Sequence, residues 1–272
     1  MLGVGFASKT ARMPEWIAVV LLGIIEGVTE FLPVSSTGHL LLAQNWLPRQ
    51  SDVFNTVVQC GAVLAVILTF TERLRQFLFQ WRDPATKDYL AKLLSAFFIT
   101  GAGGLILKKL DFELPEEVAP VAWATLIGGI LFLVVERWLR SRTSSDTVTW
   151  PIAVAAGASQ LLAAVFPGAS RSGMTILAAL ALGCSRPAAT EFSFLLGIPT
   201  LLSAGALQTW SALRGPAGPE IDWAMFALGS AVGAGTAFGV VKWLLRFVQT
   251  HTFVGFAWYR IALGIVLLLL VK

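Results

Sequence analysis

Long, continuous apolar runs make up most of the chain, with few charged residues between them. Only 13% of the 272 residues are Asp, Glu, Lys or Arg, and the mean hydropathy is +0.74. A soluble domain carries about 25% charged residues, so this chain has too few polar side chains to cover a water-facing surface. Lipid cannot satisfy backbone N–H and C=O groups, and runs without alternation favour helices over barrel strands. The sequence therefore predicts an all-α polytopic membrane protein.

Six segments approach the roughly 20 apolar residues that a transmembrane helix needs. They are Val53–Phe70, Leu90–Leu107, Val118–Trp138, Ala189–Trp210, Trp223–Phe247 and Phe253–Val271, each within a few residues at its ends. Cys60 and Cys184 lie in apolar surroundings without metal-type spacing and are interpreted as small core residues.

Two further regions are interrupted apolar stretches. The runs Glu15–Leu32 and Trp150–Phe166 each end at a proline, followed by a polar stretch and a second apolar piece too short to cross a bilayer. Proline and glycine break helices, so we predict two re-entrant helix hairpins, at residues 15–47 and 150–183.

These two hairpins resemble each other. A shift of 134 residues places Gly23 on Gly157, Glu26 on Gln160, Pro33 on Pro167 and Ser36 on Ser170. Such matches can be accidental, but three identities around an unusual break favour a repeat. The single membrane domain, 1–272, then contains two halves, 15–138 and 150–271, each with one hairpin and three spanning helices. Because three is odd, the second half must insert inverted, as in other sites built from broken helices.

Loop charge predicts the orientation. The loop Thr71–Tyr89, the region Arg140–Arg142 and the loop flanked by Lys242 and Arg246 are basic and should be cytoplasmic. The opposite loops are acidic or sparse in charge: Asp111, Glu113, Glu116 and Glu117 offset Lys108 and Lys109, and Gly215–Asp222 has no Lys or Arg. Lys9 and Arg12 would lie outside, against the trend. The sequence has no clustered basic face, so it does not indicate nucleic-acid binding.

Glu26 and Glu30, four residues apart, share one face of the first hairpin's first helix. A lone glutamate at membrane depth costs on the order of 3 kcal/mol, and two on one face also repel each other. A solvated surface face is one explanation. The strongly apolar neighbours favour a metal site or an acid/base pair.

Ser35, Ser36, Thr37 and His39 follow the break at Pro33. One of the hydroxyls can cap the next helix. His39 can activate a hydroxyl or protonate a leaving group near neutral pH, although a lone histidine is more often structural. Because the same motif also contains two carboxylates, we favour a functional role for His39.

Arg171 lies in the Ser/Gly turn of the second hairpin. It can be a buried partner for Glu26 or Glu30. It also stands at a helix start, where free N–H groups and the helix dipole favour anions, and its guanidinium suits phosphate oxygens. Together the two hairpins suggest phosphoryl chemistry.

At these residues the chain resembles the undecaprenyl-diphosphate phosphatases, also called bacitracin-resistance proteins. The resemblance covers nearly the whole chain and is strongest over the segments 26–39 and 167–173, with 54–59 and 192–196 also similar. It implies hydrolysis of undecaprenyl diphosphate to undecaprenyl phosphate and inorganic phosphate, at the outer side of the bacterial inner membrane. This reaction recycles the lipid carrier for peptidoglycan synthesis and counters bacitracin, which sequesters the diphosphate. Met174 departs from the family, where a small polar residue is common.

The resemblance and the residue chemistry together assign expected roles. Arg171, with Ser170 and Thr175, would bind phosphate and stabilise the transition state, and Ser35 and Thr37 would add hydroxyl contacts. Ser36 is the preferred nucleophile and His39 the acid or base. Glu30, with Glu26, would orient that group or bind Mg²⁺ or Ca²⁺. Attack by His39, or by a water that a glutamate activates, stays open.

Two other classes compete with this hypothesis. Inverted repeats with broken helices also occur in transporters, so a lipid-carrier flippase is the main alternative. The other membrane phosphatases need two histidines and an aspartate in their signature. The only histidines here are His39 and His251, His251 lies in an end loop, and no histidine follows Ser170 and Arg171 before it, which disfavours this class. Small residues within Gly229–Gly239 would allow close helix packing, in a homodimer or within one chain.

Overall fold

The structure, a computed structural model, describes residues 13–43, 46–48, 50–110, 117–214 and 222–270. The described residues form eleven helices: α1 (Glu15–Thr29), α2 (Ser36–Ala43), α3 (Asp52–Thr69), α4 (Thr71–Phe79), α5 (Pro84–Lys109), α6 (Val118–Leu139), α7 (Trp150–Val165), α8 (Arg171–Ala181), α9 (Arg186–Arg214), α10 (Trp223–Phe247) and α11 (Val254–Leu270). Four of these, α5, α6, α9 and α10, are long and apolar enough to cross a membrane, and the bent pair of α3 and α4 makes a fifth. The predicted polytopic, all-helical membrane protein is confirmed at this level.

The six predicted segments all coincide with helices, α3, α5, α6, α9, α10 and α11. One expectation was wrong: the stretch Thr71–Tyr89 is not simply a loop. It contains α4, which turns by 77° from α3, and the first turns of α5. The many charges of α4 suggested a loop, but Leu74 and Phe77 on one side of this surface helix pack against the core. Asp83 then caps α5 by accepting a hydrogen bond from the Thr86 N–H at 2.9 Å.

Both predicted hairpins contain a broken helix. Each second helix is preceded by a serine with positive φ, 72° at Ser35 and 69° at Ser170, a region that residues other than glycine seldom adopt. Each serine Oγ accepts a hydrogen bond at 3.1 Å from the N–H three residues later, in Gly38 and Gly173. The same local device therefore begins α2 and α8.

This geometry corrects the predicted register of the repeat. Ser35, and not Ser36, corresponds to Ser170, because the second turn has one more residue between its proline and the capping serine. After the break the shift is 135 rather than 134 residues, so Ser36 corresponds to Arg171, the first residue of α8. The sequence comparison missed this insertion because Ser35 and Ser36 are both serines, and either one can be aligned with Ser170.

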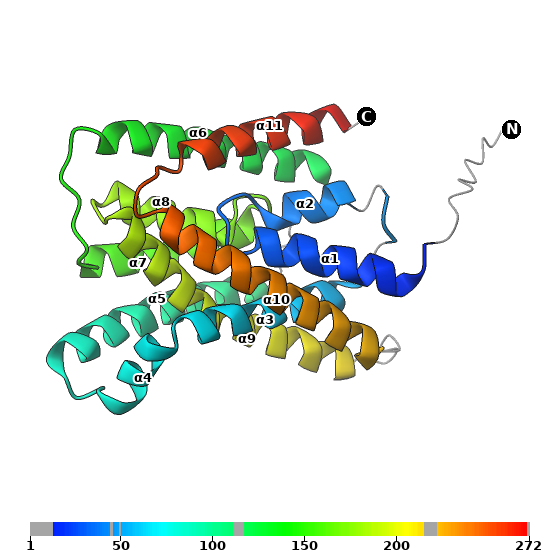
Figure 1. Ribbon diagram of the computed structural model, residues 1–272, viewed down its shortest axis with the longest axis horizontal. Coiled ribbons are helices and arrows are strands. Elements are labelled where there is room, and N and C mark those ends of the chain that lie inside the picture. Colours follow the sequence, from blue (N-terminus) through cyan, green and yellow to red (C-terminus); the bar gives the residue numbers. More distant parts are fainter. Residues whose placement is uncertain (1–12, 44–45, 49, 111–116, 215–221, 271–272) are drawn as a thin grey trace, which may run out of the picture.

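The hairpins enter the helix bundle from opposite ends. In Figure 1, α1 and α2 occupy the right part of the molecule, α7 and α8 the left part, and their turns face each other in the interior. Helix α1 packs on α10, whereas α7 packs on α5, so each hairpin contacts a helix from the other half of the chain. The glycines at the predicted repeat positions permit this approach. A Cβ at Gly23 would lie 2.9 Å from the Gly229 carbonyl oxygen, and one at Gly157 would lie 2.7 Å from that of Ala96.

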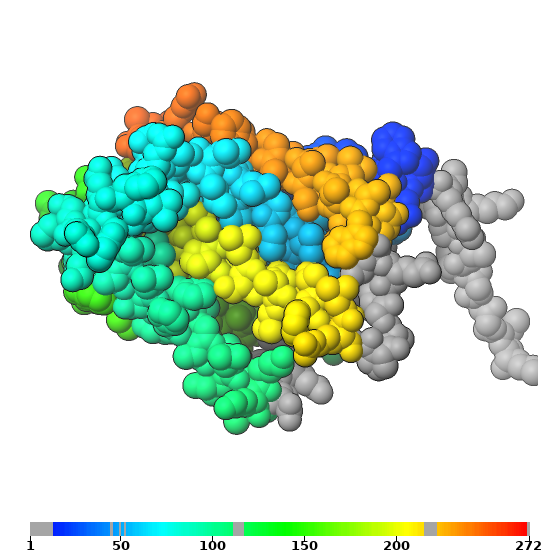
Figure 2. Space-filling view, turned by 90° about the horizontal axis from the view of Figure 1, so that it is seen from below, coloured from blue at the N-terminus to red at the C-terminus, as the bar shows by residue number. Residues whose placement is uncertain are grey.

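The outer surface is apolar and the interior holds the polar groups. Figure 2 shows α3, α5, α9 and α10 side by side on one face, and large apolar side chains such as Leu68, Phe98 and Leu207 are exposed on them. Glu26, Glu30 and Arg260 are instead buried. This distribution suits a lipid environment, in which polar groups are placed between helices.

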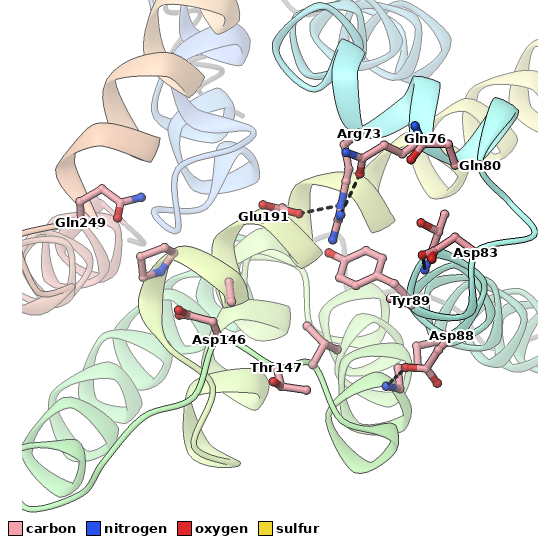
Figure 3. Close-up of a pocket in the computed structure, with 16 residues that line it drawn as sticks. Arg73, Gln76, Gln80, Asp83, Asp88, Tyr89, Asp146, Thr147, Glu191 and Gln249 are labelled. Carbon is pink, nitrogen blue, oxygen red and sulfur yellow. Dashed lines mark hydrogen bonds and ion pairs between the residues drawn. The ribbon is translucent and has the colours of Figure 1, made fainter.

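The three basic loops lie together at one end of the bundle. Arg73 of α4, Asp146 before α7 and Gln249 after α10 line one polar cavity of about 740 Å³ (Figure 3). This agrees with the expectation that these loops share one side of the membrane. Of the opposite loops, Asp111, Glu113, Glu116 and residues 215–221 lie outside the described residues, as do Lys9 and Arg12.

A buried ion pair joins three helices at this end. Glu136 near the end of α6 is 1% exposed and pairs with Arg186 at the start of α9. The Arg186 Nε donates to its Oε1 at 2.9 Å, and the Phe253 N–H just before α11 donates to the same oxygen at 2.8 Å.

We expect Glu136→Ala to lower the free energy of unfolding by about 3–5 kcal/mol, because it leaves a guanidinium and a buried N–H without an acceptor. Denaturant unfolding of the purified protein in detergent measures this loss. The control is Glu72→Ala, which breaks the exposed Glu72–Arg75 pair and should cost less than about 1 kcal/mol. Equal losses for the two variants would contradict a structural role for Glu136.

Candidate active site

The turns of the two hairpins meet through Glu30. Its Oε1 accepts a hydrogen bond from the Arg171 Nη2 at 3.0 Å, and its Oε2 accepts one from the Ser36 hydroxyl at 3.0 Å. Glu30 is 7% exposed and Ser36 is half-buried. Three predicted site residues, two from the first hairpin and one from the second, therefore form one connected chain.

The backbone of the first turn is also held by the second hairpin. The last carbonyls of a helix have no partner within that helix and need one elsewhere. The buried Ser172 hydroxyl lies 3.2 Å from the Glu30 carbonyl oxygen and 3.1 Å from that of Leu32. The position of Glu30 is thus set by contacts of both its side chain and its main chain.

Several N–H donors of Arg171 are free or only weakly hydrogen-bonded in this arrangement. Its Nη1 donates to the Ser193 carbonyl of α9 over a long 3.4 Å, and its Nε has no hydrogen-bond partner. The guanidinium lies 5.5 Å from the centre of the Phe31 ring. Gly197 provides the space for it, because a Cβ there would lie 2.5 Å from Nη1. This geometry is compatible with both predicted roles of Arg171. The side chain is a buried ion-pair partner of Glu30, and it also retains N–H groups that could bind an anion.

Glu26 lies one helical turn before Glu30 and is 2% exposed. Neither of its carboxylate oxygens has a hydrogen-bond partner in good geometry, while Glu30 and Gln59 are the side chains that interact with it. Two adjacent carboxylates suit a hard cation. Among the described residues no cluster of three or more His, Cys, Asp or Glu side chains is suited to a metal. A cation here would therefore need further oxygen ligands from phosphate or water.

His39 is held apart from the chain of Ser36, Glu30 and Arg171 by two other partners. Its Nδ1 lies 2.7 Å from the Ser35 carbonyl oxygen and its Nε2 lies 2.6 Å from the Tyr259 hydroxyl. A carbonyl only accepts, so Nδ1 carries a proton in this bond and Nε2 of the neutral ring accepts from the tyrosine. Tyr259 of α11 was not predicted, because a tyrosine in an apolar helix carries no distinctive signal.

The other predicted hydroxyls have mixed surroundings. Ser35 and Ser170 accept the capping bonds described above, and the buried Thr175 hydroxyl lies 3.0 Å from the carbonyl oxygens of Arg171 and Ser172 and contacts the Ser193 hydroxyl. Thr37 is exposed at the start of α2. The capping that sequence predicts for this turn belongs to Ser35, which leaves the Ser36 side chain to Glu30.

Arg260 is a second buried arginine near both turns and was also missed. It is 0% exposed in α11, and its guanidinium donates to carbonyls of the first turn, the second turn and α6. The available signal was a basic residue within an otherwise apolar run, which is rare at membrane depth.

An apolar groove of about 440 Å³ runs from the first turn along α10 and α11. Val34 and His39 line it near the turn, and Trp243, Phe256 and Tyr259 line it further along. The larger polar cavity at the basic end is a separate feature. There Arg73 lies 3.2 Å from Glu191 and Lys92 pairs with Asp88, while Asp83 and Asp146 also line the cavity (Figure 3). None of the predicted site residues lines that cavity.

The fold and the site define a multi-pass α-helical membrane protein with a buried polar centre at the meeting point of two broken helices. Residues 19–266 match the family model described as bacitracin resistance protein BacA, and the chain belongs to this family.

Curated relatives agree. The chain is 46% identical to an undecaprenyl-diphosphatase of Rhizobium johnstonii over 255 residues, covering 93% of this chain and 96% of the relative. It is 45% identical to one of Xylella fastidiosa over 257 residues, covering 94% and 98%. It is 46% identical to one of Xanthomonas axonopodis pv. citri over 259 residues, covering 94% and 97%.

The Glu30–Arg171 contact predicts a measurable energetic coupling. Glu30→Gln and Arg171→Met should each destabilise the protein, because each leaves a buried charge unpaired. The double variant should be less destabilised than the sum of the single losses, by about 0.5–3 kcal/mol. Denaturant unfolding of all four proteins measures the coupling.

A matched cycle combines Glu30→Gln with Arg75→Met, an arginine on the surface helix α4 that pairs with Glu72. Those effects should add within about 0.5 kcal/mol. Additivity in the Glu30–Arg171 cycle as well would mean that the two hairpins are not coupled through this pair.

Proposed function

We propose that this chain hydrolyses undecaprenyl diphosphate to undecaprenyl phosphate and inorganic phosphate, which recycles the lipid carrier for peptidoglycan synthesis and confers bacitracin resistance. The observation that carries the proposal is the chain of contacts from Ser36 through Glu30 to Arg171 in a member of this family. A hydroxyl, a carboxylate and a guanidinium are the groups that phosphoryl transfer through a serine requires.

Arg171 binds the oxygens of the terminal phosphate. Its free Nε and its weakly bonded Nη1 supply donors, and the start of α8 adds the positive end of a helix dipole. Ser170 and Thr175 assist, as do Ser35 and Thr37 at the start of α2. For Ser35, Ser170 and Thr175 this requires exchanging internal hydrogen bonds for bonds to phosphate.

Ser36 attacks the terminal phosphorus. Glu30 accepts the hydroxyl proton, which the 3.0 Å contact between the two side chains supports. The new Oγ–P bond forms as the bond between phosphorus and the bridging oxygen breaks, and the lipid leaves as its monophosphate. Water then cleaves the phosphoserine, releases inorganic phosphate and restores the Ser36 hydroxyl.

His39 supplies a proton to the departing oxygen from Nε2 of its protonated ring, and it takes up a proton from water again after each turnover. In the neutral ring Nε2 accepts from Tyr259, which keeps the ring in place. The apolar groove beside these two residues gives the isoprenoid tail a path away from the reacting phosphates. An apolar channel that ends at the hairpin turn suits a ligand with one charged end and one long apolar end.

Glu26 and Glu30 would hold a divalent cation, Mg²⁺ or Ca²⁺, together with oxygens of the substrate. The buried Glu26 carboxylate without a hydrogen-bond partner supports this assignment. Such an ion supplies charge neutralisation of the diphosphate when bound.

The architecture we propose has six spanning helices and two re-entrant hairpins in an inverted repeat, with halves 15–138 and 150–271. The matching serine caps of α2 and α8 support it, as does the packing of each hairpin on the opposite half. The basic end would face the cytoplasm of a bacterial cell, and the first hairpin would open to the periplasmic side of the inner membrane.

Phosphate release from undecaprenyl diphosphate by the purified protein in detergent tests the function. We expect turnover that a chelator abolishes and added Mg²⁺ or Ca²⁺ restores. Arg171→Lys should lower kcat about 100-fold or more, because an ammonium cannot reproduce the planar fork of donors. Arg140→Lys, at the exposed end of α6, is the control and should retain activity.

Lipid binding or translocation without phosphate release would favour the flippase alternative over hydrolysis. Turnover that survives the chelator would remove only the metal from the proposal.

Acid quenching during turnover of substrate labelled at its terminal phosphate tests the nucleophile. We expect an acid-stable label on Ser36 that is lost in Ser36→Ala and kept in Ser141→Ala, a change at an exposed serine after α6. An acid-labile label on His39 would reassign the nucleophile, and no label under rapid quenching would favour direct attack by water.

A further inference from the structure

All hydrogen-bond partners of the buried Arg260 side chain are main-chain carbonyls. Nε donates to Thr125 at 3.2 Å, Nη1 to Pro33 at 3.1 Å, and Nη2 to Ala169 at 2.9 Å. Nη2 also approaches the carbonyls of Gly168 at 3.2 Å and Ala124 at 3.4 Å. No carboxylate pairs with it among the residues that the structure describes.

These carbonyls belong to three separate parts of the chain. Pro33 lies in the turn of the first hairpin, Gly168 and Ala169 lie in the turn of the second, and Thr125 and Ala124 are in α6. One planar guanidinium therefore connects the backbones of both turns and ties them to a spanning helix. A lysine could not do so, because its ammonium offers three donors around a single atom.

The surrounding helices are shaped for this group. A Cβ at Gly128 of α6 would collide with the Arg260 guanidinium, and one at Gly173 of α8 would lie 2.9 Å from its Nη1. Thr125 supports the same arrangement, because its hydroxyl lies 3.1 Å from the Gly168 carbonyl oxygen.

We propose that Arg260 is a positioning residue for the reaction. It fixes the two hairpin turns relative to each other, so that Ser36 and Glu30 on one side meet Arg171 on the other, and it places an uncompensated positive charge behind the phosphate site. The proposal rests on the proposed hydrolysis of a lipid diphosphate at that site.

Two physical consequences support this role. In a trans peptide the C=O and the following N–H point in opposite directions, so the bonds from Arg260 fix both peptide planes, and the Val34 N–H on the far side of the first donates to the Leu32 carbonyl at 2.8 Å. A charge that is fully buried is also screened little by water or salt, so its field extends to nearby phosphates. Arg171 contacts Glu30 directly, whereas Arg260 acts through the backbone of both turns.

A purely structural clamp would hold the helices together without affecting catalysis beyond the loss of folded protein. Gly128→Ala tests the positioning role without removing the guanidinium, because the three atoms nearest to its new methyl group all belong to Arg260. Gly239→Ala in α10 is the matched control, since a Cβ there meets nothing within 4 Å. Each variant receives the same small chemical change within a helix.

We expect Gly128→Ala to lower kcat on undecaprenyl diphosphate about 100-fold, since a misplacement of about 1 Å at a reacting centre has that effect. KM should change less than kcat, because the apolar groove is untouched. Gly128→Ala should also lower the thermal midpoint below that of Gly239→Ala, because the displaced guanidinium and its carbonyls lose hydrogen bonds, so kcat is measured per folded protein below both midpoints. Normal kcat in folded Gly128→Ala would overturn the proposal. If Gly128→Ala does not fold, Arg260→Lys provides the same test, and normal kcat there would also overturn it.

A second measurement does not depend on turnover. The Glu30–Arg171 coupling, measured by the four-protein cycle, should shrink in the Gly128→Ala background and persist in the Gly239→Ala background. An undiminished coupling in Gly128→Ala would refute the positioning role even if the wild-type protein released no phosphate. Absence of turnover in the wild type with a diminished coupling would instead count against the proposed hydrolysis alone.

Discussion

The contact between Glu30 and Arg171 is the interaction on which the arrangement of the site depends. Each residue sits at the end of a helix that stops inside the bundle, and each would be an unpaired charge without the other. The energetic penalty of such a charge in an apolar interior is large, so pairing selects the arrangement in which the two turns touch. The same contact places the Ser36 hydroxyl beside a carboxylate that can accept its proton.

Broken helices create a second requirement, since their terminal backbone groups must be satisfied without water. The chain meets it with a few side chains that form hydrogen bonds to backbone groups, some local and some in other segments. Ser35 and Ser170 cap the helices that follow them, Ser172 lies against two carbonyls of the first turn, and Arg260 binds carbonyls of both turns. The polar site therefore stands on a framework of main-chain contacts, and this framework holds the two turns in one arrangement within the helix bundle.

The two cavities have different characters for a physical reason. The groove beside His39 is lined mainly by apolar side chains and runs along α10 and α11, which suits a long hydrocarbon chain. The polar cavity at the basic end lies between loops, and its charges form pairs such as Arg73 with Glu191.

The sequence by itself determined the membrane class, six apolar helices, both helix breaks and the residues Glu30, Ser36 and Arg171 that meet between the two turns. Apolar run length, proline and charge at membrane depth are local properties, and each has a direct physical meaning for a single segment. The register of the repeat needed the backbone, because two adjacent serines are indistinguishable until one adopts a positive φ. The partners of His39 and the role of Arg260 were decided only by tertiary structure. Residues 39 and 259, or 33 and 260, meet because α11 packs across the first hairpin, and no local pattern encodes which carbonyls or rings a distant helix will reach.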